Sequence, residues 1–156
     1  MIEISKEVGI DMGHRIPDHA SQCQNLHGHR YTVTAVATAP QLETQGAQKG
    51  MVMDFGFLKQ ALMHLHSLYD HQLVLYQGDP LAVLLGLEMP DKYRGLVAPV
   101  VLVPVIPTAE NLAVFWFGIV QEQLKAMAWR DEIPSEAGLI RMVVQETPTS
   151  IAVYEP

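Results

Sequence analysis

The 156-residue chain has a single cysteine, few aromatic side chains and fewer basic than acidic residues. One cysteine cannot form an internal disulfide, which excludes a disulfide-stabilised secreted scaffold. The ten Lys and Arg residues are outnumbered by 17 Asp and Glu residues, giving a formal charge of −7. This charge disfavours nucleic acid and anionic membranes as partners, although a small anionic substrate could still bind in a locally positive pocket.

Long hydrophobic runs are also missing. The longest run, around residues 98–106, is about half the ~20 residues that span a bilayer, and prolines interrupt it. The first residues, MIEISKEVGID, lack the basic and apolar regions of a signal peptide, so we expect a cytoplasmic protein with no membrane partner. The length suits one domain over residues 1–156, and a hydrophobic content of 49% is that of an ordinary globular protein.

The hydrophobic patterns predict an α+β fold in which antiparallel strand pairing is favoured. Strands are expected over residues 2–14, 27–39, 138–146 and 150–155, with a short buried strand at 100–103. Alternation is clearest in residues 27–39, where the odd-numbered positions share one face. Residues 15–26 and 40–50 are predicted to be a loop and a turn.

Two helices are predicted by N-cap residues followed by apolar residues at three- and four-residue spacing. The first is expected to begin after Asp54 and run through about Tyr69, and the second to begin after Thr108 and end near Trp129. Residues 71–106 contain four prolines and give no clear pattern outside the short strand. Their leucines could form a lid, an additional helix or an added interface.

The densest group of candidate metal ligands lies near the predicted end of the first strand and start of the second. His27 and His29 are two residues apart in a strand, so their side chains point the same way from positions about 6.6–7 Å apart. Antiparallel pairing would bring His14 alongside them. Three imidazoles suit zinc and leave its fourth tetrahedral position open. A His-x-His pair is weak by itself, with about 0.3 expected by chance, and structural histidines are the alternative.

Two other parts of the chain bear on this site. His64 and His66 have the same spacing but fall in a predicted helix, where they lie on different faces, so we interpret both as exposed. Cys23 is a candidate nucleophile or base, because a nearby cation favours the thiolate. It could instead be a small buried residue or the fourth ligand of a closed structural zinc site, although its polar neighbours argue against burial.

Further polar residues mark the ends of predicted elements. In Asp70-His71 a carboxylate could orient an imidazole for proton relay, or the pair could be a surface dipeptide. Glu146 ends an apolar strand, where it could accept N–H groups of a ligand or simply be solvated. Thr108 and Glu110 are explained as a helix N-cap and an acid that is favourable near a helix N-terminus.

In order along the chain, these residues resemble the 6-pyruvoyltetrahydropterin synthase / 6-carboxytetrahydropterin synthase family. The matching landmarks are His14, Cys23, His27-Gly28-His29, Gly50-Met51-Val52-Met53-Asp54-Phe55, Asp70-His71, Pro107-Thr108-Ala109-Glu110-Asn111 and Glu146-Thr147. They cover nearly the whole chain. The three-residue gap between Cys23 and His27 resembles the 6-carboxytetrahydropterin synthase branch, which serves 7-deazaguanine and queuosine synthesis.

The resemblance implies a tunnelling fold, with an antiparallel four-stranded sheet, two helices on one face and subunits joined into a β-barrel. It implies a homo-oligomer, a trimer or a homohexamer, with active sites at the subunit interfaces. It implies Zn²⁺ held by His14, His27 and His29. Cys23 would be the proton-abstracting group, with Asp70 and His71 supplied by a neighbouring subunit.

The substrate implied by the resemblance is 7,8-dihydroneopterin triphosphate, which would yield 6-carboxy-5,6,7,8-tetrahydropterin, acetaldehyde and triphosphate. Glu146 would anchor the pterin, with Thr108 and Glu110 as further substrate-binding residues. Alternatives are a 6-pyruvoyl product formed by triphosphate elimination, or a non-catalytic member that binds metal or pterin. Candidates for binding the triphosphate are Arg15, Arg30, Lys49 and Lys59. The chain departs from the family at Ile10-Asp11-Met12-Gly13-His14, where aromatic-x-Ala-Ala-His is usual, and in its longer segment between His71 and Pro107.

Overall fold

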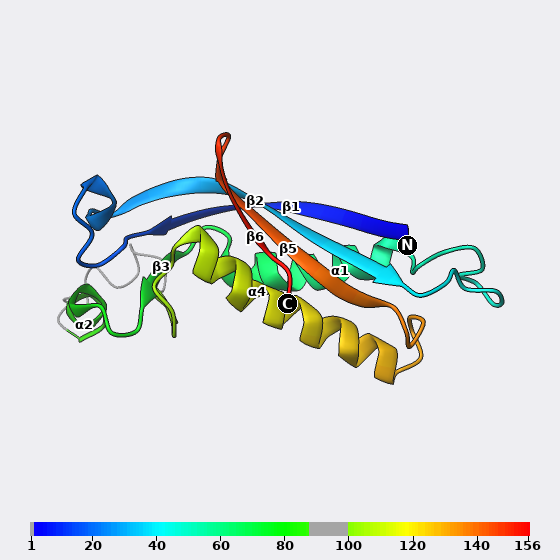
Figure 1. Cartoon of the computed structure of the whole chain (residues 1–156). Helices are drawn as coiled ribbons and strands as arrows, with labels where there is room; N and C mark the ends of the chain where they lie inside the picture. The colour runs from blue at the N-terminus through cyan, green and yellow to red at the C-terminus, as the bar shows by residue number, and fades with distance from the viewer. Residues whose placement is uncertain (1, 88–99) are drawn as a thin grey trace.

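The computed structural model describes residues 2–87 and 100–156, which form a curved six-stranded sheet over two long helices (Figure 1). The strands are Ile2–His14 (β1), His27–Ala39 (β2), Leu73–Tyr76 (β3), Val100–Val103 (β4), Gly138–Thr147 (β5) and Ser150–Tyr154 (β6). The helices are Phe55–Tyr69 (α1), Pro80–Leu87 (α2) and Ala109–Trp129 (α4), with a 3-10 turn at Gln22–Gln24 (η1). Both long helices cover the same face of the sheet, which confirms the predicted α+β class.

The sheet has the strand order β4-β3-β1-β2-β5-β6. Strands β1, β2, β5 and β6 are consecutive and antiparallel, so they form the four-stranded sheet that the resemblance implies. Strands β3 and β4 extend the β1 edge by parallel pairing, which the sequence did not predict. The strand predicted over residues 100–103 is confirmed as β4, although only Val103 of it is buried, whereas β3 was not predicted.

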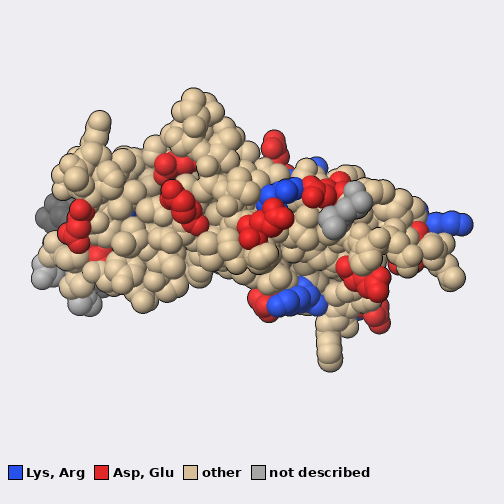
Figure 2. Space-filling model, in the orientation of Figure 1, with Lys and Arg blue, Asp and Glu red and all other residues tan. Residues whose placement is uncertain are grey.

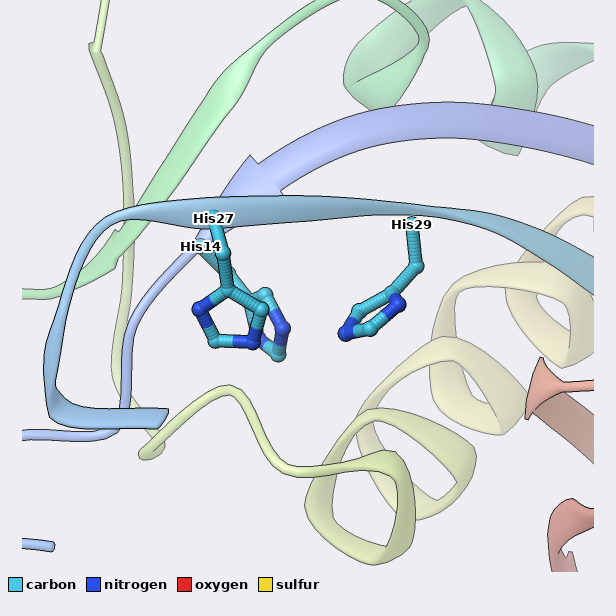
Figure 3. Close-up of side chains that lie close together, drawn as sticks. All are labelled: His14, His27 and His29. Carbon is cyan, nitrogen blue, oxygen red and sulfur yellow. The ribbon is translucent and has the colours of Figure 1, made fainter. Parts of the chain in front are cut away.

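The predicted helix starts are confirmed by their capping bonds. A carboxylate oxygen of Asp54 accepts from the backbone N–H of Gly56 at 2.6 Å, at the start of α1. The hydroxyl of Thr108 accepts from the backbone N–H of Asn111 at 3.3 Å, at the start of α4. Each bond satisfies one of the N–H groups that a helix leaves without an internal partner. The cap of α4 also fixes the end of that helix that lies nearest the histidines (Figure 3).

The hydrophobic core lies between the sheet and the two long helices. In β2 the alternation predicted from the sequence buries Tyr31, Val33 and Ala35 on the face toward the helices. Trp116 of α4 is buried and packs edge to face on Tyr31, with ring centroids 6.1 Å apart. The strand that carries two of the candidate ligands is therefore held against α4 by packing next to the site.

Part of the segment between the Asp70-His71 pair and Pro107 forms the additional helix that was one of the expectations from the sequence. This helix is α2, and Asp79 accepts the backbone N–H of Leu81 at 2.9 Å in its first turn. Asp79 is buried and lies 3.1 Å from Nε of Arg15, the residue that follows His14. Residues 88–99 of this segment lie outside the described residues. None of the helices in the described ranges combines the length and hydrophobicity needed to cross a bilayer.

Candidate active site

Three histidines converge at the end of the β1–β2 pair, on the face toward α4 (Figure 3). In the antiparallel register His14 is opposite His27, and Met12 is opposite His29, as the sequence predicted for a shared face. One nitrogen from each ring lies within 4.8 Å of the others. His14 is buried and the other two are half-buried, so the cluster opens on one side.

Hydrogen bonds to backbone carbonyls orient two of these rings. Nδ1 of His14 lies 2.8 Å from the carbonyl oxygen of Pro107, and Nδ1 of His27 lies 2.8 Å from that of Asn25. A carbonyl can only accept, so each Nδ1 carries the proton and each Nε2 keeps its lone pair. Burial lowers the pKa of His14, and the Pro107 carbonyl only partly opposes it, which favours the neutral form that binds metal.

The arrangement fits a tetrahedral metal ion with one open position. Zinc–nitrogen bonds of about 2.0–2.1 Å require small side-chain adjustments from the present spacing. Backbone carbonyls that hold the second ring nitrogen are the usual outer partners of metal-bound histidines. Cys23 does not belong to this group of candidate ligands. It is a free, half-buried thiol in η1, so the geometry favours an open site over a structural site closed by Cys23.

Glu146 and Tyr31 form the wall of the site next to His14. The register between β5 and β6 shifts between Gln145 and Thr147, and Glu146 lies at this irregularity, where bulges commonly redirect a side chain. Its Oε1 accepts the hydroxyl of Tyr31 at 2.9 Å and lies 3.6 Å from Nε2 of His14. A carboxylate predicted only from its place at a strand end is thus adjacent to the histidine cluster.

Asp70 and His71 contact each other directly, although neighbouring residues seldom do so. Nδ1 of His71 lies 2.7 Å from Oδ2 of Asp70, and His71 has a left-handed backbone with φ 58°. Oδ1 of Asp70 accepts the backbone N–H of Asp11 at 2.9 Å. Partial burial acts to raise the pKa of Asp70, but the Asp11 N–H and the nearby imidazoles outweigh it and lower the pKa below its usual value.

The interpretation of both helix histidines as exposed is wrong for one of them. His64 is exposed, but His66 is half-buried and its Nε2 lies 3.4 Å from Oδ2 of Asp70. His66 and Asp70 are four residues apart at the end of α1, so they lie on the same side of the helix. This i, i+4 spacing in the sequence was the signal that could have placed His66 beside Asp70.

The Asp70–His71 pair lies at the edge of β1, where the backbone N–H of His71 donates to the carbonyl oxygen of Asp11 at 2.6 Å. A groove of about 660 Å³ is lined there by Asp11, Gly28, Arg30 and His71, and also by the candidate ligands His27 and His29. Asp11 and Arg30 pair across the strands in register and form an ion pair at 3.3 Å. The imidazole of His71 is 78% exposed. One chain therefore brings the candidate metal ligands together with Glu146, whereas its Asp70–His71 pair lies at the β1 edge and is not part of the histidine cluster.

The remaining predicted residues are placed less distinctively. Thr108 caps α4, and Glu110 is exposed in the first turn of that helix. Of the basic candidates, Lys49 and Lys59 are exposed, while Arg15 and Arg30 each pair with a carboxylate. On the face shown in Figure 2 the described Lys and Arg side chains are few and lie beside acidic ones.

Tyr31 is the site residue that sequence reasoning missed. It was assigned only to the buried face of β2, yet its hydroxyl lies 3.1 Å from Nε2 of His14. The signal was present, because Tyr31 continues the alternation of His27 and His29 by one further step. After His27 and His29, Tyr31 is the third residue on this face of β2, and its position brings the hydroxyl into contact with the histidine cluster.

Comparisons with known proteins agree with this geometry. A family model described as 6-pyruvoyl tetrahydropterin synthase matches residues 3–156. Proteins named 6-carboxy-5,6,7,8-tetrahydropterin synthase are similar to the chain. The protein from Haemophilus influenzae is 33% identical, and the match covers 99% of this chain and 99% of that protein. The protein from Synechocystis is 38% identical, and the match covers 97% of this chain and 91% of that protein.

Solved structures show the same fold. An uncharacterised protein from Wolinella succinogenes has a TM-score of 0.80 at 20% identity, over 99% of this chain and 97% of that one. The 6-pyruvoyl tetrahydropterin synthase of Plasmodium falciparum has a TM-score of 0.70 at 16% identity, with the same two coverages. The tunnelling fold expected from the sequence is confirmed. The chain belongs to the 6-pyruvoyl tetrahydropterin synthase family and lies in its 6-carboxytetrahydropterin synthase branch.

Proposed function

We propose that this chain is a zinc-dependent lyase acting in 7-deazaguanine and queuosine synthesis. It converts 7,8-dihydroneopterin triphosphate and one water molecule to 6-carboxy-5,6,7,8-tetrahydropterin, acetaldehyde and triphosphate. The observation that carries the proposal is the carboxylate of Glu146, which lies 3.6 Å from Nε2 of His14 in the metal cluster. A site that combines a metal position with a carboxylate can hold a pterin ring and its side chain together.

The three histidines would hold the metal, and in His14 and His27 the carbonyl bound at Nδ1 leaves the lone pair of Nε2 free. Zinc at this site would supply Lewis acidity toward the hydroxyl oxygens of the substrate side chain, which makes the neighbouring C–H bond more acidic. His14 and His27 keep their ring orientation through Pro107 and Asn25, so the ligand set is largely formed before the metal binds.

Glu146 anchors the pterin ring. An ionised carboxylate can accept two parallel N–H bonds, which matches the amidine-like edge of a pterin. Tyr31 uses one lone pair of Oε1, and the other lone pairs of the carboxylate stay available for the ligand. Thr108 and Glu110 lie at the start of α4, and we assign them supporting contacts to the substrate.

Proton transfer is assigned to Cys23 and to the Asp70–His71 pair. The Cys23 thiolate removes a proton from the side-chain carbon next to the ring, because a nearby cation favours the ionised thiol. His71 receives or returns protons, and the carboxylate of Asp70 orients its ring. The imidazole of His71 is 78% exposed at the β1 edge and is not part of the histidine cluster of its own chain, so we assign the His71 that serves a given site to a neighbouring copy, as the family resemblance implies.

The proposal is tested by incubating the purified, zinc-loaded protein with 7,8-dihydroneopterin triphosphate and measuring acetaldehyde and the pterin product. Equal amounts of acetaldehyde and 6-carboxytetrahydropterin are expected. A 6-pyruvoyl product without acetaldehyde would assign the sister reaction, and no turnover at all would point to a non-catalytic binding protein.

Cys23→Ala separates the role of the thiol from that of the metal. We expect zinc content to stay equal to that of the unmodified protein while turnover falls by about 10²–10⁴-fold, as for loss of a general base. Zinc is measured by elemental analysis after dialysis. Loss of zinc from this variant would instead make Cys23 a structural ligand and remove it from the proton-transfer scheme.

A further inference from the structure

We propose that Tyr31 is a positioning residue that couples metal loading to pterin binding, through one hydroxyl shared between His14 and Glu146. The inference rests on the proposed function for the identity of the ligand. The hydroxyl lies 3.1 Å from Nε2 of His14 and 2.9 Å from Oε1 of Glu146. It is thus within hydrogen-bond distance of a metal-ligand atom and of the carboxylate assigned to the pterin.

A tyrosine hydroxyl has a single proton to donate, and here two acceptors compete for it. Nε2 of His14 is an acceptor because Nδ1 of the same ring donates to Pro107. Oε1 of Glu146 is the second acceptor. Without metal, the proton of Tyr31 is divided between the imidazole and the carboxylate, and the carboxylate is held only part of the time.

A metal held by the three histidines would use the lone pair of Nε2 of His14. That would remove one of these acceptors and leave the Tyr31 proton to Glu146. A hydrogen bond to a charged acceptor is stronger than one between neutral groups, so it can fix one orientation of this partly exposed carboxylate. Glu146 is then preorganised for the pterin edge, and a preorganised group binds its ligand more tightly because less freedom is lost on binding.

The packing around Tyr31 keeps the hydroxyl in place. The residue is 0% exposed, and its ring meets those of Trp116, His14 and His29 edge to face, with centroids 5.8–6.1 Å apart. The side chain cannot swing out to solvent without disrupting the core at α4.

The test measures binding of 6-methylpterin, which keeps the amidine edge but has no side-chain hydroxyl groups that could bind the metal directly. Dissociation constants are measured by fluorescence for the zinc-loaded and the chelator-treated protein. We expect zinc to tighten binding about tenfold in the unmodified protein, the equivalent of about 1.4 kcal/mol. In Tyr31→Phe the ratio of the two dissociation constants should fall to within about twofold of unity.

Tyr69→Phe is the matched control. Tyr69 is also buried and also packs on Trp116, with ring centroids 5.4 Å apart, but it belongs to α1 and not to the site. This variant should keep the tenfold ratio, and both variants should keep the thermal unfolding midpoint to within a few degrees.

A ratio that survives in Tyr31→Phe overturns the inference, as does a ratio near one in the unmodified protein. The result is independent of turnover, because 6-methylpterin has no side chain to cleave. A protein that releases acetaldehyde but shows no coupling keeps the proposed function and loses the role of Tyr31. A protein that binds no 6-methylpterin with or without zinc overturns the role of Tyr31 as well.

Discussion

The two faces of the β1–β2 pair differ sharply over the same few residues. On the face toward α4, His14, His27 and His29 are partly or wholly buried and converge with Glu146. Gly28 and Arg30 alternate with these histidines and line an open groove together with His71, His27 and His29. The first face gathers three candidate metal ligands beside a carboxylate, whereas the groove is bordered by the exposed imidazole of His71.

Strand geometry separates the side chains of the two sets only in part. Adjacent residues of a strand point to opposite sides, so His27 and His29 point toward α4 while Gly28 and Arg30 point away, but both histidines also border the groove. Asp70 is held at the edge of β1 by the backbone N–H of Asp11. If both sets act in one reaction, the family resemblance implies that each acts with its counterpart on another copy.

The largest effect is expected from removing a metal ligand on the buried face. In His27→Ala we expect metal affinity to fall by more than about a hundredfold and turnover by about a thousandfold. Zinc content and acetaldehyde release are measured on the same preparations. The exposed His64 provides the control, because His64→Ala removes an imidazole from α1 without touching the cluster. Full zinc content in His27→Ala would show that the histidines do not form the metal site.

The separation of the faces is tested next by mixing two inactive variants. Cys23→Ala lacks the thiol and His71→Ala lacks the groove-side imidazole, so each alone should be inactive. If every site combines Cys23 of one copy with His71 of another, random mixed assembly restores about a quarter of the sites. The variants are unfolded together, refolded and assayed for acetaldehyde against each variant refolded alone. No recovery in mixed oligomers would mean that both residues serve the same chain.

Much of this comparison could be predicted from the sequence, because it depends on alternation. The spacing of His27 and His29 predicts a shared face, and the antiparallel register places His14 beside them. The N-caps Asp54 and Thr108 mark both long helices by local chemistry that tertiary contacts do not override. Local patterns therefore identify the candidate metal ligands and the elements that carry them.

Contacts that depend on tertiary geometry could not be predicted in the same way. The bond between Tyr31 and Glu146 joins residues 115 positions apart at a register shift in the β5–β6 ladder. The short strands β3 and β4 form through parallel pairing to β1 and to each other, and neither has an alternating pattern of its own. The contact of His66 with Asp70 was predictable from the four-residue spacing of the two residues, although the sequence led us to expect both histidines of α1 to be exposed.

The smallest effect is expected on the groove side, in the acid stability of Asp70→Asn. The folded-state pKa of Asp70 lies below the usual value of 3.8, so folding favours its ionised form. This contribution is present above about pH 4 and is lost as the pH falls through the lower folded-state pKa. Asp70→Asn should therefore be less stable than the unmodified protein at pH 7, by up to about 1 kcal/mol, and the difference should shrink toward pH 3.

Urea unfolding at pH 7, 5, 4 and 3 and fixed protein concentration measures this difference, since an oligomer's stability depends on concentration. Glu136→Gln is the control for loss of one negative charge, because Glu136 is exposed on the chain between α4 and β5. Zinc content of Asp70→Asn should be unchanged, because the side chain of Asp70 contacts His66, His71 and the Asp11 backbone rather than the clustered histidines. Loss of zinc together with stability would mean that the two faces are not independent, and that the groove side supports the metal site through the shared strands.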